Sequence, residues 1–295
     1  MKDNQQNALL VAPSPLIDIG VNLTNERFHG KSDEIIDQSL AAKVTHQIIT
    51  GTSLASSEVA LALCERYPEQ LRSTVGIHPH DASEFNSSAR SGLRGLLQNT
   101  YCVAVGETGL DFNRNFSTPQ DQEKAFEAQL ELAIEFQKPL FMHERDAFAR
   151  QHEILKSYRD HIADGVIHCF TGNQQALFGY LDLDLYIGIT GWVCDERRGT
   201  DLQALVHNIP PDRLMIETDA PYLLPRNMTP KPKDRTNRPA YLPWVLKELS
   251  LHTGLSELDL ACKTSDNARR FFRLPEHFAP ANEVENEPVS DFYRL

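Results

Sequence analysis

Histidine and carboxylate side chains recur in this chain within or at the end of short apolar runs. Glu107 lies in the run at 102–109, His143 in the run at 139–145 and His168 in the run at 165–172. Neutral imidazole nitrogens and carboxylate oxygens are the donors that bind divalent cations in hydrolase sites. A single histidine after an apolar run is more often a hydrogen-bonded core residue, so metal binding is indicated only if several such residues meet.

Strand periodicity brings these residues together. Side chains two apart on a strand share a face, and this rule groups Val103 and Val105 with Glu107, Phe141 with His143, Val166 with His168, and Met215 with Glu217 and Asp219. Carboxylates that converge repel one another and lose hydration, and a divalent cation compensates both costs. The sequence therefore predicts a metal centre built from several strands.

Other polar residues fit this centre less directly. We interpret His80 and Asp111 as groups that order loops or support the ligands. Strand alternation is expected to turn Cys169 toward the helices, away from His168. Two further pairs have no assigned role. Asp18 and Asn22 are hard to place because an amide is a poor metal ligand beside histidine, and Trp192 and Cys194 fit lining or packing equally well.

The elements that must position these residues are eight apolar, β-rich runs. They lie at 16–24, 45–52, 72–79, 102–109, 139–145, 165–172, 185–192 and 213–222. Each is followed by a segment long enough for a helix, and Thr118 with Pro119 forms a helix start before an apolar face. The alternation predicts a parallel (β/α)8 TIM barrel, whose active sites lie at the carboxyl ends of the strands. An open doubly wound sheet is the alternative, but no GxGxxG turn follows the first strand.

Composition narrows the class of protein. The chain has 295 residues and 41% hydrophobic content, enough for one large α/β domain or two smaller ones. We assign residues 16–274 to the barrel, 1–15 to an extension and 275–295 to an acidic tail. The sequence has no apolar run near the ~20 residues that span a bilayer and no signal-peptide pattern at its start, so we expect a cytoplasmic protein without membrane association.

Charge and cysteine content add two constraints. Five cysteines without a CxxC pair indicate reduced thiols rather than disulfides or a cysteine zinc site. A net charge of −12 argues against passive binding of nucleic acid over the whole surface, so an anionic substrate needs a local cation. The basic segment 226–238 offers Arg226, Lys231 and Lys233 as phosphate contacts, with Arg114, Arg145 and Arg197 as alternatives.

Several motifs together resemble one known family. They are "IDIGVNLT", "GIHPHD", "GETGLDFNRNFSTP", "FMHERDA", "HCFTG", "YIGITGWVCDERRG" and "IETDAPYLLPRNMTPKP". Over about residues 16–272 the chain is similar to the TatD family of metal-dependent nucleases, and within it to the branch of cytoplasmic 3′-to-5′ exonucleases of single-stranded DNA and RNA. The resemblance implies a TIM barrel, a Mg²⁺-type cofactor and a role in repair of oxidatively damaged DNA.

The resemblance also implies roles for single residues. Glu107, His143 and His168 match metal ligands, and Asp219 matches the aspartate of the last strand; His78 and Glu217 match positions near the scissile phosphate. Many family members carry a His-x-His pair on the first strand, and "DIGVN" has none, so the number of ions, one or two, stays open. Glu144 stands where a small or thiol side chain is expected, but alternation turns it away from the metal.

We therefore expect metal-assisted phosphodiester hydrolysis of single-stranded DNA or RNA by a monomer. Mg²⁺ is the expected cation, with Mn²⁺ or Zn²⁺ as alternatives; Asp219 or Glu217 accepts a proton from water, and His78 stabilises charge on the phosphate. The 3′ polarity comes from the resemblance alone. Two other functions fit the same residues: hydrolysis of an amide or ester, and a binding barrel without catalytic activity.

Overall fold

The protein is a nearly closed barrel of eight parallel strands, seen in a computed structural model that describes residues 9–275. The strands pair in sequence order and are β1 (Leu16–Val21), β2 (Val44–Ile49), β3 (Leu71–Val75), β4 (Cys102–Asp111), β5 (Leu140–Arg145), β6 (Gly165–Ile167), β7 (Tyr186–Ile189) and β8 (Leu214–Ile216). Val21 forms a parallel bridge with Ala220, which brings the last strand back to the first. The predicted (β/α)8 barrel is confirmed.

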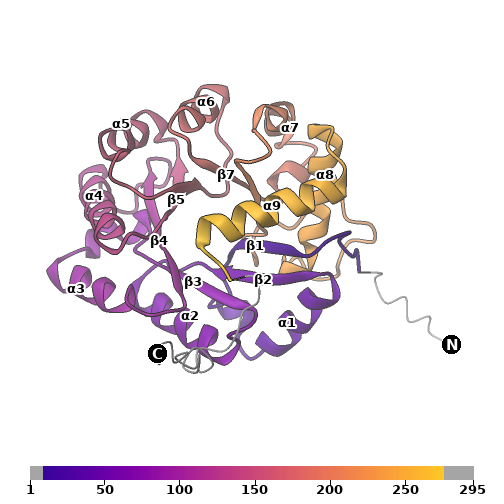
Figure 1. Ribbon diagram of the computed structural model, residues 1–295, viewed down its shortest axis with the longest axis horizontal. Helices are drawn as coiled ribbons and strands as arrows, with labels where there is room; N and C mark the ends of the chain where they lie inside the picture. Colours follow the sequence, from indigo (N-terminus) through magenta and orange to yellow (C-terminus); the bar gives the residue numbers. More distant parts are fainter. Residues whose placement is uncertain (1–8, 276–295) are drawn as a thin grey trace, which may run out of the picture.

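Helices surround the barrel in the part of the chain that is described (Figure 1). They are α1 (Ser32–Ala41), α2 (Leu54–Arg66), α3 (Ser87–Leu96), α4 (Pro119–Phe136), α5 (Phe148–Tyr158), α6 (Gln174–Asp182), α7 (Thr200–Leu205), α8 (Leu242–Thr253) and α9 (Glu257–Phe272). Short 3₁₀ helices lie at Glu26–Phe28, Pro79–Glu84, Gly191–Cys194, Val206–Asn208 and Pro239–Tyr241. α4 begins as predicted: the Thr118 hydroxyl accepts the backbone N–H of Asp121, and Pro119 is the first helical residue.

The strands end earlier than most of the predicted runs, and this changes what alternation can say. β6 and β8 have three residues each, so His168, Glu217 and Asp219 follow their strands rather than lie on them. On β4, Ala104 packs in the inner cluster with Phe141 and Met215, whereas Val105 packs in the outer layer against the helices.

The prediction that Val105 shares a face with Glu107 is therefore wrong. The register between β4 and β5 shifts between Val105 and Thr108, and this irregularity returns the Glu107 side chain to the inside of the barrel. Phe141 and His143 do share the inner face, as predicted, and Phe141 stacks on His168 with ring centroids 4.5 Å apart.

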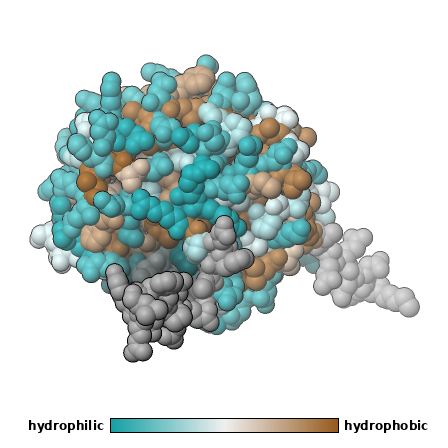
Figure 2. Space-filling view, viewed as in Figure 1, coloured by the Kyte–Doolittle hydropathy of each residue, from teal (hydrophilic) through white to brown (hydrophobic). Residues whose placement is uncertain are grey.

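α9 closes the amino-terminal end of the barrel. Asn267 donates to the carbonyl oxygens of Pro211 and Leu214, where β8 begins, at 2.9 and 2.8 Å. Phe271 packs edge-on against Tyr186 with ring centroids 5.4 Å apart. Figure 1 shows the helix lying across the barrel, and Figure 2 shows a largely hydrophilic outer surface over the middle of this face. This end is filled, so a site must lie at the opposite end.

The chain before β1 also contacts the barrel. Ala12 is buried and its N–H donates to the carbonyl of Ala42 at 3.1 Å, while the Pro15 carbonyl accepts from Ser265 at 2.9 Å. The part of the predicted extension at 9–15 therefore packs on α1 and α9. Most of the predicted acidic tail, residues 276–295, lies outside the described residues. Within residues 9–275 no helix is long and apolar enough to cross a membrane.

Candidate metal centre and active site

A cavity of about 1380 Å³ opens at the carboxyl ends of the strands. Its lining comes from loops that follow strands on every side of the barrel, including Asn22, His78, Glu107, His143, His168 and Asp219. The position agrees with the rule that barrel enzymes place their catalytic groups at this end. The sequence prediction that polar residues gather at the carboxyl ends is confirmed by this lining.

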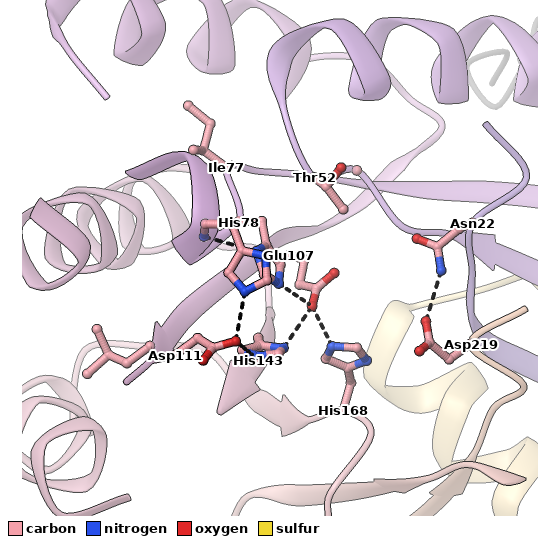
Figure 3. Close-up of polar contacts among 12 residues, drawn as sticks. Asn22, Thr52, Ile77, His78, Glu107, Asp111, His143, His168 and Asp219 are labelled. Atoms are coloured by element: carbon pink, nitrogen blue, oxygen red, sulfur yellow. Dashed lines mark hydrogen bonds and ion pairs between the residues drawn. The ribbon is translucent and has the colours of Figure 1, made fainter. Parts of the chain in front are cut away.

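Glu107 stands at the centre of a group of imidazoles. Its Oε1 lies 2.7 Å from Nε2 of His168, 3.2 Å from Nδ1 of His143 and 3.3 Å from Nε2 of His78. Figure 3 shows the three rings directed at this carboxylate from three different strands or loops. Four of the predicted site residues are thus brought together around one oxygen atom.

This donor set fits a divalent cation. Ligand atoms of His78, Glu107 and His143 all lie within 4.8 Å of one another, and His168 contacts the same Glu107 oxygen. Imidazole nitrogens and a carboxylate oxygen at such spacing can rearrange around one ion with small side-chain movements. The sequence placed His78 beside the phosphate only, whereas its ring here lies within the ligand group itself.

A second carboxylate supports His143 from its other side. Asp111 Oδ2 lies 3.3 Å from Nε2 of His143 and 2.8 Å from Nε2 of His80. The other oxygen of Asp111 accepts the backbone N–H groups of Asn113 and Arg114. Asp111 thus contacts the His143 and His80 rings and orders the loop at Asn113 and Arg114. We call these six residues the histidine half of the cavity: His78, His80, Glu107, Asp111, His143 and His168.

Charge in the histidine half favours ionised carboxylates. Burial alone would raise the pKa of Glu107, but the positive charges on His168 and His78 outweigh it and hold the pKa well below its usual value. Burial would likewise lower the pKa of His168, yet Glu107 and Glu217 raise it well above its usual value. For His78 burial prevails and lowers the pKa. Glu107 is therefore an anion, the form of a carboxylate that binds a metal.

The opposite side of the cavity, where β8 meets β1, contains carboxylates with different partners. Asp219 Oδ1 accepts the Asn22 side-chain N–H at 2.8 Å, and Figure 3 shows this pair beyond His168, away from the Glu107 group. Burial raises the pKa of Asp219 to about 7, and the nearby Glu107 and Glu217 charges add to the effect, while His168 opposes it. Asp219 faces the cavity but is outside the close group of ligand atoms.

Glu217 lies beneath the cavity rather than on its surface. It is fully buried, it accepts the backbone N–H of Cys169, and its Oε2 lies 3.4 Å from Nδ1 of His168. Gly20 makes this position possible, because a Cβ on Gly20 would collide with the Glu217 carboxylate. The sequence expected Glu217 beside Asp219 at the mouth; its contacts are instead those of a group that orients His168.

Asp18 connects the first and last strands. Its carboxylate accepts the backbone N–H and the hydroxyl of Thr218, at 2.9 and 2.5 Å. Burial raises the pKa of Asp18 to about 8 despite these hydrogen bonds. The residue had no assigned role in the sequence, and a buried aspartate within an apolar strand was the only signal for one. We call Asp18, Asn22, Glu217, Thr218 and Asp219 the β1–β8 seam.

The expected orientation of Cys169 is wrong. β6 ends at Ile167, and Cys169 has a left-handed backbone with φ 47°, so alternation no longer applies at this position. Its side chain lines the cavity and lies 3.7 Å from the Thr190 hydroxyl. Trp192 also lines the cavity, whereas Cys194 is buried in the outer layer.

The basic segment lies apart from the cavity lining. Arg226 forms an ion pair with Glu196 at 2.6 Å, and Lys231 and Lys233 are exposed. The cations that do line the cavity are Arg114, Arg145 and Arg198. Arg198 lies over the Trp192 ring at 4.6 Å, while Arg197 is bonded to Asp195.

Buried glutamines from the helices hold the strand ends in place. Gln129 of α4 accepts from the N–H of Ile77 and donates to its carbonyl, at 2.8 and 3.0 Å. Gln122 does the same for Asp111, at 2.8 and 3.1 Å, and Gln151 of α5 accepts from Leu110 at 2.8 Å. These amides replace sheet hydrogen bonds next to His78 and Asp111. The sequence analysis missed them, although a glutamine on the apolar face of a helix was a visible signal.

The sequence and the fold both have known relatives. The TatD related DNase family matches residues 17–273. A Salmonella typhimurium protein named "3'-5' ssDNA/RNA exonuclease TatD" is 49% identical over 259 residues, which cover 88% of this chain and 99% of that protein. A protein of the same name from Pectobacterium parmentieri is 47% identical over 88% of this chain and 100% of its own.

A solved structure gives the same relationship. The TatD homologue YjjV from Escherichia coli superposes with a TM-score of 0.81 at 25% identity, covering 88% of this chain and 98% of that one. The family match spans the barrel from β1 through α9, including both the histidine half and the β1–β8 seam. With a family match over residues 17–273 and 47–49% identity to these relatives over 88% of its length, the chain belongs to the TatD related DNase family.

Proposed function

We propose that this protein is a metal-dependent 3′-to-5′ exonuclease of single-stranded DNA and RNA. The observation that carries the proposal is the group of His78, His143 and His168 around one Glu107 oxygen in the open mouth of the barrel. The relatives at 47–49% identity are named for this activity and match 88% of this chain. The cavity has a volume of about 1380 Å³ and lies at the open end of the barrel.

Glu107, His143 and His168 would hold the cation, with Asp219 as a further ligand from the β1–β8 seam. When bound there, a divalent ion supplies Lewis-acid chemistry: it polarises a phosphate oxygen and makes a water molecule more acidic. Mg²⁺ is the cation implied by the family resemblance, but imidazole-rich sites favour Mn²⁺ or Zn²⁺ over Mg²⁺. His78 would also be able to bind the ion, in addition to its proposed contact with the phosphate, because its ring lies within 4.8 Å of the ligand atoms of Glu107 and His143.

The protein's own groups then handle the proton and the charge. Asp219, which faces the cavity from the seam, accepts a proton from the attacking water. The water oxygen bonds to phosphorus, the bond from phosphorus to the leaving oxygen breaks, and the leaving oxygen takes up a proton from solvent water. Glu217 takes part by holding His168 in orientation, and His78 stabilises charge on the phosphate. Arg226, Lys231 and Lys233 remain proposed contacts to phosphates outside the cavity.

The remaining properties follow from the family. Cleavage from the 3′ end, action on both DNA and RNA, and a role in repair of oxidative damage are proposed on the names of the relatives and on the resemblance. We also infer that the enzyme works as a cytoplasmic monomer. None of these depends on the geometry of the Glu107 group.

The test is a metal titration followed by strand digestion. Dialysed protein is titrated with Mg²⁺, Mn²⁺ or Zn²⁺ and mixed with single-stranded DNA or RNA labelled at the 5′ or the 3′ end. We expect the 5′-labelled strand to shorten stepwise and the 3′ label to leave at once as a mononucleotide. Cleavage of an aryl ester but of no strand would favour the amide or ester hydrolase, and metal binding without any cleavage would favour a binding barrel.

A further inference from the structure

One loop at the rim of the cavity has an unusual composition for its position. Between β4 and α4, Phe116 is 69% exposed although it is a large apolar side chain. Its ring lies edge-on to His80 with centroids 4.8 Å apart, and it lines the cavity together with Arg114. No hydrogen bond or ion pair engages the Arg114 guanidinium within residues 9–275. An exposed aromatic ring and a free cation two residues apart face the same open space.

The exposure of Phe116 does not come from a loosely held loop. The next residue, Ser117, is buried; its hydroxyl donates to the His80 carbonyl at 2.8 Å and accepts the N–H of Ser83 at 3.0 Å. Gln122 donates to the Ser117 carbonyl at 3.0 Å.

In the part of the loop that precedes Phe116, the Asn113 side chain donates to Asp146 at 2.6 Å, and the Phe112 N–H donates to the Arg145 carbonyl at 2.9 Å. The loop is therefore fastened to β5 and to the segment after β3. These hydrogen bonds hold the Phe116 side chain exposed to solvent. In this position the ring is not stabilised by burial of its apolar surface.

We propose that Arg114 and Phe116 form a nucleotide subsite, in which a base of the single strand stacks on the Phe116 ring and Arg114 binds the phosphate of that nucleotide. The inference rests on the proposed function and adds the place where the strand is held. Proteins that bind single strands combine cations with aromatic rings in this way, because every base has a face that can stack. The ring borders the Asp111 and His80 pair, so the stacked base lies beside the catalytic cavity.

The decisive experiment removes the base instead of the ring. Short 5′-labelled single strands carry one abasic nucleotide, moved stepwise from the 3′ end, and binding is measured by fluorescence anisotropy in EDTA, where no cleavage occurs. For the wild type we expect one abasic position to weaken binding about fivefold. In Phe116→Ala this penalty should disappear, because the base has lost its partner, and in Phe116→Trp it should persist.

Matched variants separate a local effect from a general one. Phe178→Ala removes another partly exposed phenylalanine, on α6 and outside the cavity lining, and should keep the wild-type abasic profile. Arg114→Ala should flatten the dependence of log K on log salt by about 0.7, whereas Arg270→Ala on α9 should leave it unchanged.

An abasic profile that is the same in wild type and Phe116→Ala would overturn the subsite while leaving the exonuclease intact. If the wild type neither binds nor shortens single strands, the proposed function is wrong and the subsite with it. Binding and shortening of single strands by the wild-type protein decide between the two failures, because both are retained when only the subsite is wrong.

Discussion

The histidine half and the β1–β8 seam both contain buried carboxyl groups at the same end of the barrel, but their pKa values shift in opposite directions. In the histidine half, imidazoles lower the pKa of Glu107 and of Asp111 in spite of burial. In the seam, Asp219 and Asp18 accept from amide, backbone and hydroxyl donors instead, and burial raises the pKa of Asp219 to about 7 and of Asp18 to about 8. The two regions thus differ in whether imidazole neighbours or burial sets the pKa of a buried carboxylate.

The largest effect is expected from removing imidazoles. His143→Ala and His168→Ala should each lose bound metal and nearly all nuclease activity, at least 100-fold in kcat/KM, because each deletes a donor next to Glu107. Metal content is measured by elemental analysis and folding by circular dichroism. His207→Ala, an exposed histidine away from the cavity, is the control and should behave as wild type. Wild-type activity of either variant at limiting metal would show that the residue is not a ligand.

Replacing Glu217 tests whether this residue orients His168 or binds the metal itself. Glu217→Gln should lower kcat roughly 10- to 100-fold while the amount of metal bound at saturation stays unchanged, as for residues that position a ligand. Gly20→Ala should have a similar effect, since the added methyl group displaces the same carboxylate. Loss of metal as complete as in His143→Ala would instead make Glu217 a ligand and would remove the distinction between the two halves.

Asp18 tests the seam through stability. Its raised pKa means that the folded protein binds a proton that the unfolded chain releases above its ordinary pKa of 3.8. This contribution to stability is therefore present at low pH and is lost as pH rises toward about 8.

Asp18→Asn mimics the protonated side chain, so its Tm should be closest to that of wild type at pH 4, where little of this contribution has been lost. At pH 8 its Tm should be higher by roughly 2–4 °C, equivalent to about 1 kcal/mol. Thermal unfolding in EDTA at both pH values measures the difference. A Tm gap that does not change with pH would mean that Asp18 stays ionised.

The smallest effect is expected outside both halves. Replacing Lys231 and Lys233 by Ala should weaken single-strand binding and flatten the dependence of log K on log salt by about one unit, a value between the ~0.7 of one phosphate contact and the ~1.4 of two. Metal content should not change. Binding titrations at several salt concentrations give the slope, and an unaltered slope would assign the phosphate contacts to Arg114, Arg145 and Arg198 in the cavity lining.

The sequence predicted the barrel and most of the site because both depend on regular strands. Apolar runs marked all eight strands, and polar residues at their ends marked the mouth. Alternation failed where strands end or shift: Cys169 and Asp219 have left-handed backbones, with φ of 47° and 52°, and β4 changes register before Thr108. Periodicity carries no information past such points.

The distribution of roles could not be predicted for a different reason. Which carboxylate meets which partner depends on contacts between distant segments, such as Asp18 with Thr218 and Asn22 with Asp219. Residue types alone gave the same expectation for Glu217 and Asp219, yet one is buried under His168 and the other faces the cavity.

The helix that closes the lower end of the barrel also orders events during synthesis. α9 contributes Phe271 and Phe272 to the inner cluster with Ile17 and Tyr186, which come from strands made much earlier. Until residues 257–272 leave the ribosome, those strands expose their apolar inner ends to water. We therefore expect a chain that lacks residues 257–272 to have all of the cavity residues but to leave the inner cluster uncovered at the amino-terminal end of the barrel, where exposed apolar surface promotes aggregation.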